Sequence, residues 1–424
     1  MATETIENKP LSAYNAFDPA VIACPYDYYR KLRHEAPVYR DPQSGIVMVS
    51  KCSLVLDVLR NHADFSSDFG EMLAGRGAPS PAVLAIFAEG YPDVPTLLSC
   101  DPPAHNRYRS LVNKAFLPRR IDAIEPAMVK LAHELIDGFV ERGQCDLMRD
   151  FCVVFPLIVI ADQLGVPRDN LAAFRRWSEA VVAQLGQMLD EEHAVEAARD
   201  VVAFQRYFAH KSEEKRTAPS DDILSDLVSA RIEGERPLSV PEMLSILQQI
   251  LVAGNETTAS AIGEGVRLLI SHPEQLAKVE SDPSLVNNLV EEVLRLSTPT
   301  ANMWRVARRD TEIGGFPVTR GSMILLRFAS ANRDEDRFDP AESFDVTRAN
   351  AGTHVSFGFG IHFCVGAALA RREMQVAFRA LLSRLSSLSL GVSPGELSYR
   401  PNILLRRLDA LPITFSPKET TARP

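Results

Sequence analysis

The sequence predicts a mainly α-helical protein with a small β region. Long segments carry apolar residues at a spacing of three or four, whereas alternating apolar residues occur only in short runs beside turn-forming residues. The chain has 424 residues, 46% hydrophobic and 24% charged, an ordinary balance for a protein with a packed core. We expect one domain over residues 11–417, with flexible polar ends at 1–10 and 418–424.

Five segments are predicted to be helical because their apolar residues recur on one face. They are 120–142, 170–213, 240–271, 284–297 and 366–387. The segment 240–271 is the best defined, because Ser239 is a suitable N-cap and Glu242 can complete a capping box. It should end before Pro273, since the residue preceding a proline avoids the helical region.

Short strands are predicted in two places. Residues 38–40 and 46–49 flank a turn-rich segment and read as a hairpin, and 311–313 and 323–326 form a second pair of short apolar runs. Residues 65–100 are rich in Gly, Pro and Ser and predict a long irregular loop. Loops of this length in compact domains are usually functional.

Charge and hydropathy exclude several classes of protein. The net charge of −9 argues against a general nucleic-acid binder, whose surface would be basic. The N-terminal residues have no basic segment followed by an apolar core, so we expect no secretion signal. The longest apolar stretch, 151–161, contains Pro156 and is too short to cross a bilayer. We therefore expect a cytoplasmic protein with no membrane attachment.

One of the six cysteines stands in an unusual setting. Residues 357–366 read FGFGIHFCVG and place Cys364 among glycines and aromatics, directly ahead of a helix-favouring run. Glycines permit positive φ and a close approach to a flat ligand, and a helix start favours a thiolate. The pattern is typical of a cysteine that is the axial ligand of a haem iron. The alternative is a small buried hydrophobic residue in a turn, the interpretation we give the other five cysteines.

The middle of the long predicted helix contains a polar interruption. Residues 253–258 read AGNETT, in which glycine costs ~1 kcal/mol and threonine is a weak helix former. One interpretation is a harmless polar patch on a solvated face. The other is a helix distorted against a bound ligand, in which Gly254 leaves room for dioxygen and Glu256 and Thr257 deliver protons.

Two further motifs place charged residues on helix faces. Glu292 and Arg295 are three residues apart, which alone is most simply a surface ion pair worth ~0.5 kcal/mol or less. Asp101 precedes two prolines and is expected to cap a helix. His105 and Arg109 would then lie on one face of that helix.

Taken together, these motifs resemble the cytochrome P450 family. They occur along the chain as DPPxHxxYR, AGxETT, ExxR, ANRD, FxxxR and FGxGxHxCxG, which is the family's order. The resemblance covers nearly the whole chain, from the hairpin after Pro37 to the residues near 400–413. It implies the cytochrome P450 fold, with residues 11–417 as a single haem domain.

The resemblance also implies roles for individual residues. Haem b would be bound with the Cys364 thiolate as axial ligand, next to Phe357, Gly358, Gly366, Ala253 and Gly254. The haem propionates would be paired by His105, Arg109, Arg305 and His362. Glu256 and Thr257 would be the catalytic acid–alcohol pair, with Glu where many members have Asp. Glu292, Arg295 and Arg348 would form a structural triad that supports the cysteine loop.

The implied activity is a haem-thiolate monooxygenase. It would insert one atom of O₂ into a hydrophobic small molecule, by hydroxylation or epoxidation of a terpenoid, steroid, aromatic or fatty acid. The positions that resemble substrate contacts are Leu97, Leu98, Val252, Ala253, Asn302, Met303, Ile403 and Leu404. Most are apolar, and Asn302 offers one orienting hydrogen bond.

Electrons are expected from a separate ferredoxin and its reductase, because the cysteines outside the loop lack cluster-binding spacing. Arg119, Arg120, Arg371 and Arg372 are candidates for attracting an acidic ferredoxin. We expect a monomer that binds no nucleic acid. Two alternatives stay open: a non-catalytic haem sensor or carrier, and a haem-free helical binding protein.

Overall fold

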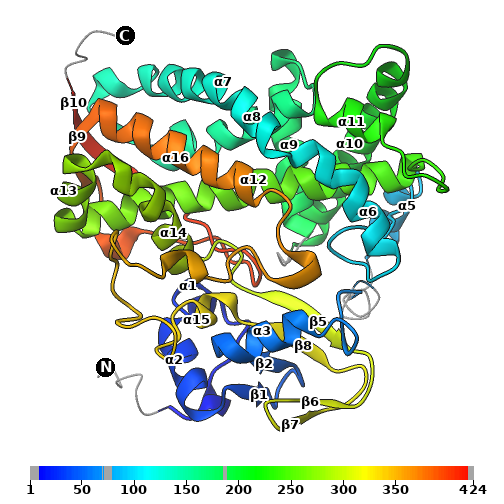
Figure 1. The fold of residues 1–424 in the computed structure, drawn as a ribbon, viewed down its shortest axis with the longest axis horizontal. Coiled ribbons are helices and arrows are strands. Elements are labelled where there is room, and N and C mark those ends of the chain that lie inside the picture. Colours follow the sequence, from blue (N-terminus) through cyan, green and yellow to red (C-terminus); the bar gives the residue numbers. More distant parts are fainter. Residues whose placement is uncertain (1–8, 69, 71–78, 185–188, 419–424) are drawn as a thin grey trace. The chain divides into compact units, whose positions relative to one another are not determined.

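The computed structural model describes residues 9–68, 70, 79–184 and 189–418 (Figure 1). The predicted flexible ends lie mostly outside these residues. The structure is 57% helical and 11% strand, so the predicted fold class is confirmed. The chain divides into two compact units: Met1–Phe69, Glu264–Cys364 and Ser393–Asp409 form the first, and Gly70–Gly263, Val365–Val392 and Ala410–Pro424 form the second.

The first unit is built on a five-stranded sheet. Its strands, in spatial order, are β1 (Val38–Arg40), β2 (Val47–Val49), β8 (Met323–Leu326), β5 (Met303–Ala307) and β3 (Phe65–Ser66). β2 and β8 are parallel and the other neighbours are antiparallel. Buried valines, leucines and isoleucines from this sheet pack against α3 (Cys52–Arg60). A separate hairpin is formed by β6 (Thr311–Ile313) and β7 (Phe316–Val318).

Short helices complete the first unit. They are α1 (Pro19–Ala23), α2 (Tyr26–Glu35), α13 (Pro273–Ser281), α14 (Val286–Ser297) and α15 (Phe328–Ala331), with 3₁₀ turns at Leu11–Ala13, Pro283–Leu285, Ala351–Thr353, Gly360–His362 and Pro394–Glu396. α14 is almost entirely buried, including its charged residues Glu292 and Arg295. The charged side chains of α14 must therefore find partners inside the unit.

The second unit is mostly helical. Its helices are α5 (Pro81–Phe87), α6 (Ala104–Asn113), α7 (Pro118–Asp137), α8 (Val154–Gln163), α9 (Leu171–Gln184), α10 (Glu191–Thr217), α11 (Ile223–Ser229) and α16 (Ala367–Arg384). Shorter turns lie at Lys114–Phe116, Val140–Arg142, Met148–Cys152 and Arg168–Asn170. α7 and α16 run side by side (Figure 1). A small sheet has the order β4 (Gln144–Asp146), β10 (Pro412–Pro417) and β9 (Leu385–Leu390).

The long helix α12 (Val240–Ser271) begins and ends where the sequence predicts. The Glu242 amide donates to Ser239 Oγ at 3.4 Å, and the Ser239 amide donates to Glu242 Oε2 at 2.7 Å, which is the predicted capping box. α12 contributes residues to both units, whose boundary falls between Gly263 and Glu264. Within the part of the chain that the structure describes, no helix combines the length and apolarity needed to span a bilayer.

Two local predictions are wrong. Asp101 is not the N-cap of its helix: α6 begins at Ala104 with Pro103 in the cap position, because both prolines precede the first turn. The segment 65–100 is not wholly irregular, since it contains β3 and α5; residues 69 and 71–78 of it lie outside the described residues. Ser80 caps α5, its Oγ accepting a 3.4 Å hydrogen bond from the Val83 amide.

Candidate functional site

The loop that carries Cys364 has a backbone that only glycine adopts easily. Gly358 and Gly360 have φ angles of +70° and +72°, in the left-handed region. A Cβ on Gly360 would lie 2.9 Å from the carbonyl oxygen of Leu59 on α3. Both this close contact and the positive φ angle therefore disfavour a side chain at position 360. The Cys364 amide donates a 2.9 Å hydrogen bond to the carbonyl oxygen of Phe357, which closes the loop. The glycines of this motif therefore have a structural explanation within the first unit.

Aromatic side chains flank the thiol. Phe357 and Phe363 meet edge to face with their ring centroids 6.3 Å apart, and the Arg60 guanidinium lies 4.9 Å from the Phe359 centroid. Phe359 and Phe363 remain 39% and 41% exposed, although large apolar side chains are usually buried. Exposed apolar side chains next to a cysteine are what a flat hydrophobic ligand would cover.

Cys364 differs from the cysteines of the core. Burial raises the pKa of Cys52 to about 11 and that of Cys145 to about 12, so both are thiols at neutral pH. Cys364 is only partly buried and is not in a disulfide. Cys24 is more exposed but follows the short helix α1 and has no glycine loop. The chemistry of Cys364 is therefore that of an accessible single sulfur ligand.

The residues predicted as a triad form a buried network on α14. Glu292 accepts from Arg295 Nε at 2.7 Å and Nη2 at 2.8 Å, and from Arg348 Nε at 3.1 Å. Arg295 also donates to the carbonyl oxygens of Ala341 and Asn332 at 2.7 and 3.0 Å. All three charged side chains are almost fully buried, so the surface ion-pair interpretation of the Glu292–Arg295 motif is wrong.

Asn332 links this network to the cysteine loop. Its carbonyl accepts from Arg295, and its side chain donates to Thr298 Oγ1 at 2.9 Å and to Ser356 Oγ at 2.8 Å. Its Oδ1 accepts from the Val355 amide at 2.8 Å. Val355 and Ser356 directly precede the loop, so a continuous set of hydrogen bonds connects α14 to the segment that carries Cys364.

On α12, the predicted polar interruption does not break the helix. The backbone is helical throughout, and Thr257 Oγ1 donates a 2.7 Å hydrogen bond back to the carbonyl oxygen of Ala253. Ala253 is exposed and Gly254 and Thr257 are partly exposed, whereas their neighbours are buried. These three positions form one open strip between buried stretches of the helix. The predicted distortion is therefore limited to this hydroxyl–carbonyl contact.

The polar residues beside the strip are buried. Asn255 Nδ2 donates to Ser178 Oγ at 3.0 Å, and Asn255, Glu256 and Thr258 are 4%, 7% and 2% exposed. A harmless patch on a solvated face is therefore excluded. Glu256 and Thr257 are adjacent and so point about 100° apart around the helix. A Cβ on Gly254 would meet the Ile160 side chain at 3.6 Å, an ordinary contact, so packing within the second unit does not require glycine there.

The four residues expected to pair propionates lie in both units. His105 and Arg109 are on α6 in the second unit, buried and partly buried respectively. Arg305 is buried on β5 in the first unit, where its Nη1 donates to the Trp304 carbonyl at 2.7 Å, and His362 is partly buried in the 3₁₀ turn before Cys364. Gly366 is the N-cap of α16. One accessible sulfur, two imidazoles and two guanidiniums are a donor set that fits an iron porphyrin with two carboxylates.

The residues expected to contact substrate form a group within each unit. In the second unit, Leu98 is held next to α12 by a 3.1 Å hydrogen bond from its amide to Gln249 Oε1, one turn before Val252, and Leu97 packs on the same core. In the first unit, the Leu404 carbonyl accepts from the Ala301 amide at 2.8 Å, and Ile403 precedes it. Met303 opens β5.

The side chain of Asn302 is already engaged within the protein, so it does not offer substrate the orienting hydrogen bond that the sequence suggests. It is 2% exposed; its Nδ2 donates to the Ile403 carbonyl at 2.6 Å, and its Oδ1 accepts from Arg327 Nη1 at 3.2 Å. Sequence reasoning missed Arg327. The available signal was a single charge in the apolar run MILLRFA at 323–329.

Two of the four arginines suggested for partner docking are ion-paired. Arg372 bonds Asp122 at 3.0 Å and also Glu125, and Arg120 bonds Asp221 at 3.2 Å and also Asp226. Arg119 is exposed and Arg371 partly exposed. The acidic partners reduce the contribution of Arg120 and Arg372 to any basic surface.

Comparison with known proteins gives a consistent result. The cytochrome P450 family model matches residues 170–407, more than half of the chain. The 6-deoxyerythronolide B hydroxylase of Saccharopolyspora erythraea is 37% identical, with 92% of this chain and 95% of that protein covered. The steroid C26-monooxygenase of Mycobacterium tuberculosis is 35% identical, with 92% and 93% covered.

Solved structures agree. The structure of cytochrome P450 CYP109Q5 from Chondromyces apiculatus matches with a TM-score of 0.84 and 36% identity, over 96% of this chain and 100% of that one. These matches extend across both units and include the segments that carry the cysteine loop, the long helix and the buried triad. The chain belongs to the cytochrome P450 family, and this membership implies a haem held by a cysteine thiolate.

Proposed function

We propose that this cytochrome P450 monooxygenase uses haem b, bound through the Cys364 thiolate, to insert one atom of O₂ into a hydrophobic small molecule. The observation that carries the proposal is the cysteine loop. Two left-handed glycines and the Phe357–Cys364 backbone hydrogen bond shape a loop that carries a partly exposed cysteine just after two exposed aromatic residues, Phe359 and Phe363. No other cysteine among the described residues has such a setting.

The other residues have supporting roles in this proposal. His105, Arg109, Arg305 and His362 bind the two haem propionates, and Phe357, Gly358, Gly366, Ala253 and Gly254 border the porphyrin. When bound, the haem supplies reductive activation of dioxygen. Glu292, Arg295 and Arg348 support the loop through Asn332. The exposed strip of α12 gives Ala253 and Thr257 access to a ligand.

Thr257 and Glu256 would deliver protons in sequence. The Thr257 hydroxyl has access to the open strip, and its proton is directed to the Ala253 carbonyl at 2.7 Å. Rotation of the hydroxyl would turn its proton towards the open strip, and the buried Glu256 carboxyl would be the source that restores it. Because the two side chains point in different directions, we infer that a water molecule connects them.

The electron donor in this proposal is a separate ferredoxin with its reductase. Arg119 is the best candidate for an acidic partner, because it is exposed, whereas Arg120 and Arg372 are already paired with carboxylates. Replacing Arg119 by Glu should weaken ferredoxin binding, whereas the same change at Arg372 would also break its pairs with Asp122 and Glu125.

For the substrate, the names of the relatives favour bulky hydrophobic molecules such as a macrolide precursor or a steroid. The positions Leu97, Leu98, Val252, Met303, Ile403 and Leu404 are apolar and suit such ligands. In this proposal they exclude water from the reacting group, and Asn302 positions Ile403 through their 2.6 Å hydrogen bond.

The decisive test is the spectrum of the reduced, carbon monoxide-bound protein. A red-shifted Soret band, characteristic of thiolate ligation, is expected; its absence would overturn the haem-thiolate assignment in favour of a haem-free binding protein. Turnover with ferredoxin, reductase and NAD(P)H then separates an enzyme from a haem sensor. An enzyme couples NAD(P)H use to product with at least one hydrophobic compound, whereas a sensor couples it with none.

A further inference from the structure

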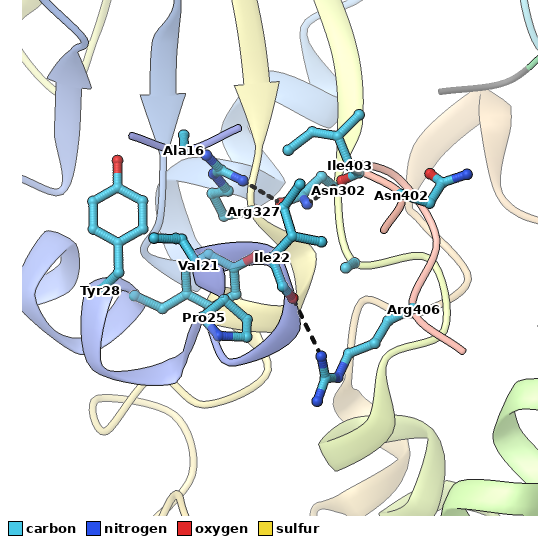
Figure 2. A pocket seen from close by; sticks show the side chains of 12 residues that line it. Ala16, Val21, Ile22, Pro25, Tyr28, Asn302, Arg327, Asn402, Ile403 and Arg406 are labelled. Atoms are coloured by element: carbon cyan, nitrogen blue, oxygen red, sulfur yellow. Dashed lines mark hydrogen bonds between the residues drawn. The ribbon is translucent and has the colours of Figure 1, made fainter. Parts of the chain in front are cut away.

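A pocket in the first unit lies between the N-terminal helices and the segments around Asn302 and Ile403 (Figure 2). Its empty space is about 320 Å³, including open solvent at its mouth. The enclosed part is much smaller, with about 20 Å³ open to the centre of a water molecule, so the pocket suits the small polar end group of a ligand rather than a whole ligand. The lining residues are Ala16, Val21, Ile22, Pro25, Tyr28, Tyr29, Ala301, Asn302, Arg327, Asn402, Ile403 and Arg406.

Arg327 is the unusual member of this lining. It is 2% exposed, yet among the described residues no carboxylate lies within ion-pair distance of its guanidinium. Its guanidinium contacts neutral groups: Nη1 donates to Asn302 Oδ1 at 3.2 Å and Nη2 to Met48 Sδ at 3.1 Å. The rings of Tyr28 and Tyr29 lie 5.9 and 5.5 Å away. Arg327 Nε is buried without a hydrogen-bond acceptor in the structure described.

Three other deeply buried arginines of this unit, Arg33, Arg295 and Arg348, are paired with carboxylates. Arg33 bonds Glu335 at 2.7 Å, and Arg295 and Arg348 share Glu292. A buried charge without a counterion is costly, and removing one partner of such a pair costs about 3–5 kcal/mol. The same unit therefore supplies a carboxylate to each of these three arginines but not to Arg327.

The rest of the lining adds donors and no negative charge. Asn402 is 5% exposed; its Oδ1 accepts from the Leu404 and Leu405 amides, while its Nδ2 has no acceptor among the described residues. Arg406 also lines the pocket, with Nη1 donating to the Ile22 carbonyl at 3.3 Å. Burial raises the pKa of Tyr28 to about 12, so its hydroxyl is neutral and cannot balance Arg327. No Asp or Glu lines the pocket.

We propose that this pocket binds the carboxylate end of an amphipathic substrate, with Arg327 as its counterion. The proposal rests on the proposed function, since Asn302 and Ile403 are both pocket residues and expected substrate contacts. The carboxylate would take the Nε–H and a second guanidinium N–H of Arg327, with Asn402 Nδ2 as a further donor. The apolar body of the substrate would extend along Ile403 and Leu404. The substrate class then narrows to hydrophobic carboxylic acids.

The test uses the intact holoprotein and three probes: decanoate, decanamide and acetate. Dissociation constants are measured by calorimetry and, in parallel, by the shift of the haem spectrum. Wild type should bind decanoate about tenfold more tightly than decanamide, the ratio expected for a charge-assisted hydrogen bond. Arg327→Met should bring the ratio to about one, and Arg327→Lys should keep part of it. Acetate should bind at least about tenfold more weakly than decanoate.

Asn302→Asp is the second variant, because it places a carboxylate 3.2 Å from Arg327 without removing the cation. It should abolish the preference for decanoate in a folded protein, even if Arg327→Met does not fold. Equal binding of decanoate and decanamide by wild type overturns the pocket assignment. Acetate binding as tightly as decanoate overturns the substrate assignment and leaves a site for small free anions. Loss of the thiolate band would instead count against the proposed function, while the calorimetric ratio still tests Arg327.

Discussion

The Thr257 hydroxyl donates a 2.7 Å hydrogen bond to the carbonyl oxygen of Ala253, on an exposed strip in the middle of α12. This contact keeps the hydroxyl oriented along the helix and leaves its oxygen facing the strip. A threonine that only filled space on a buried helix would not need this exposure. The relationship therefore makes Thr257 the first residue to test.

Thr257→Ala should fold and keep the thiolate Soret band, because the side chain is partly exposed and the cysteine loop is unchanged. Product formed per NAD(P)H should fall roughly tenfold or more, with peroxide accounting for the lost reducing equivalents. The measurement compares NAD(P)H consumed, product and peroxide in one assay. Thr257→Ser is the matched control and should stay close to wild type; unchanged coupling in Thr257→Ala would remove Thr257 from proton delivery.

Cys364→Ala should lose the red-shifted Soret band of the reduced carbon monoxide complex, because no other sulfur occupies the loop. Cys24→Ala is the control: Cys24 is exposed and lies outside the glycine loop, so its loss should leave the band in place. A variant without Cys364 that still shows the band would contradict the assignment of the axial ligand.

Glu292→Ala should lower the free energy of unfolding by about 3–5 kcal/mol, because it leaves Arg295 and Arg348 buried side by side without their shared carboxylate. Urea denaturation measures the change. The exposed pair of Arg30 and Asp27, 2.9 Å apart, gives the matched control, and Asp27→Asn should cost less than about 1 kcal/mol. Equal losses in the two variants would mean that the triad is no more important than a surface pair.

Glu242 at the start of α12 should make stability fall in acid. Burial raises its pKa, but hydrogen bonds from Arg236, Ser239 and Tyr108 outweigh this and lower the pKa to about 2. Its ionised form stabilises the fold above the ordinary value of 4.5, and this contribution is lost as pH falls towards 2. We expect a loss of about 2–3 kcal/mol in wild type over that interval.

The comparison for this prediction is Glu242→Gln, which should be less stable at pH 7 and show a flatter acid limb in urea denaturation. Glu134→Gln removes an exposed carboxylate, 3.6 Å from Lys130, and should keep the wild-type profile. Parallel profiles for wild type and Glu242→Gln would rule out this carboxylate as the acid-sensitive group.

Glu373 on α16 should make stability fall as pH rises, which is opposite to the effect of Glu242. Burial raises the pKa of this carboxyl well above its usual 4.5, so it is protonated where surface acids are charged. Its contribution to stability is complete below pH 4.5 and is lost as pH rises through the raised pKa. Glu373→Gln should therefore gain stability relative to wild type as pH increases, measured by thermal unfolding from pH 4.5 upward. A constant difference across that range would show that Glu373 does not titrate in the folded protein.

The sequence predicted the parts of this fold that are encoded locally. The capping box of Ser239 and Glu242 and the left-handed glycines around Cys364 depend on neighbours within a few residues, and both could be recognised. β10 could not: it starts and ends with proline and pairs with β4 and β9, which come from distant parts of the chain. Asp101 was wrongly predicted as an N-cap: Asp-Pro-Pro suits the start of a helix, but α6 begins only at Ala104.

The candidate site was predictable to a similar extent. Motif order singled out Cys364 and Thr257 as candidates, because their local sequences are the ones suited to the chemistry. It did not reveal that Asn302 is engaged by Ile403 and Arg327, since those contacts join residues 25 and 101 positions apart. A single arginine in an apolar run is visible in the sequence, but whether a carboxylate reaches it depends on tertiary packing.

The 2.9 Å approach of Gly360 to the Leu59 carbonyl has a consequence for how the protein can be divided. The segment 170–407 that matches the family model contains the cysteine, the long helix and the triad, yet it lacks α3. A fragment that begins at residue 170 would keep the cysteine loop, the long helix and the triad. It would lose Leu59, whose carbonyl oxygen lies against Gly360. The shape of the cysteine loop therefore depends on the N-terminal part of the chain, and we expect that a peptide of the loop alone would not keep it.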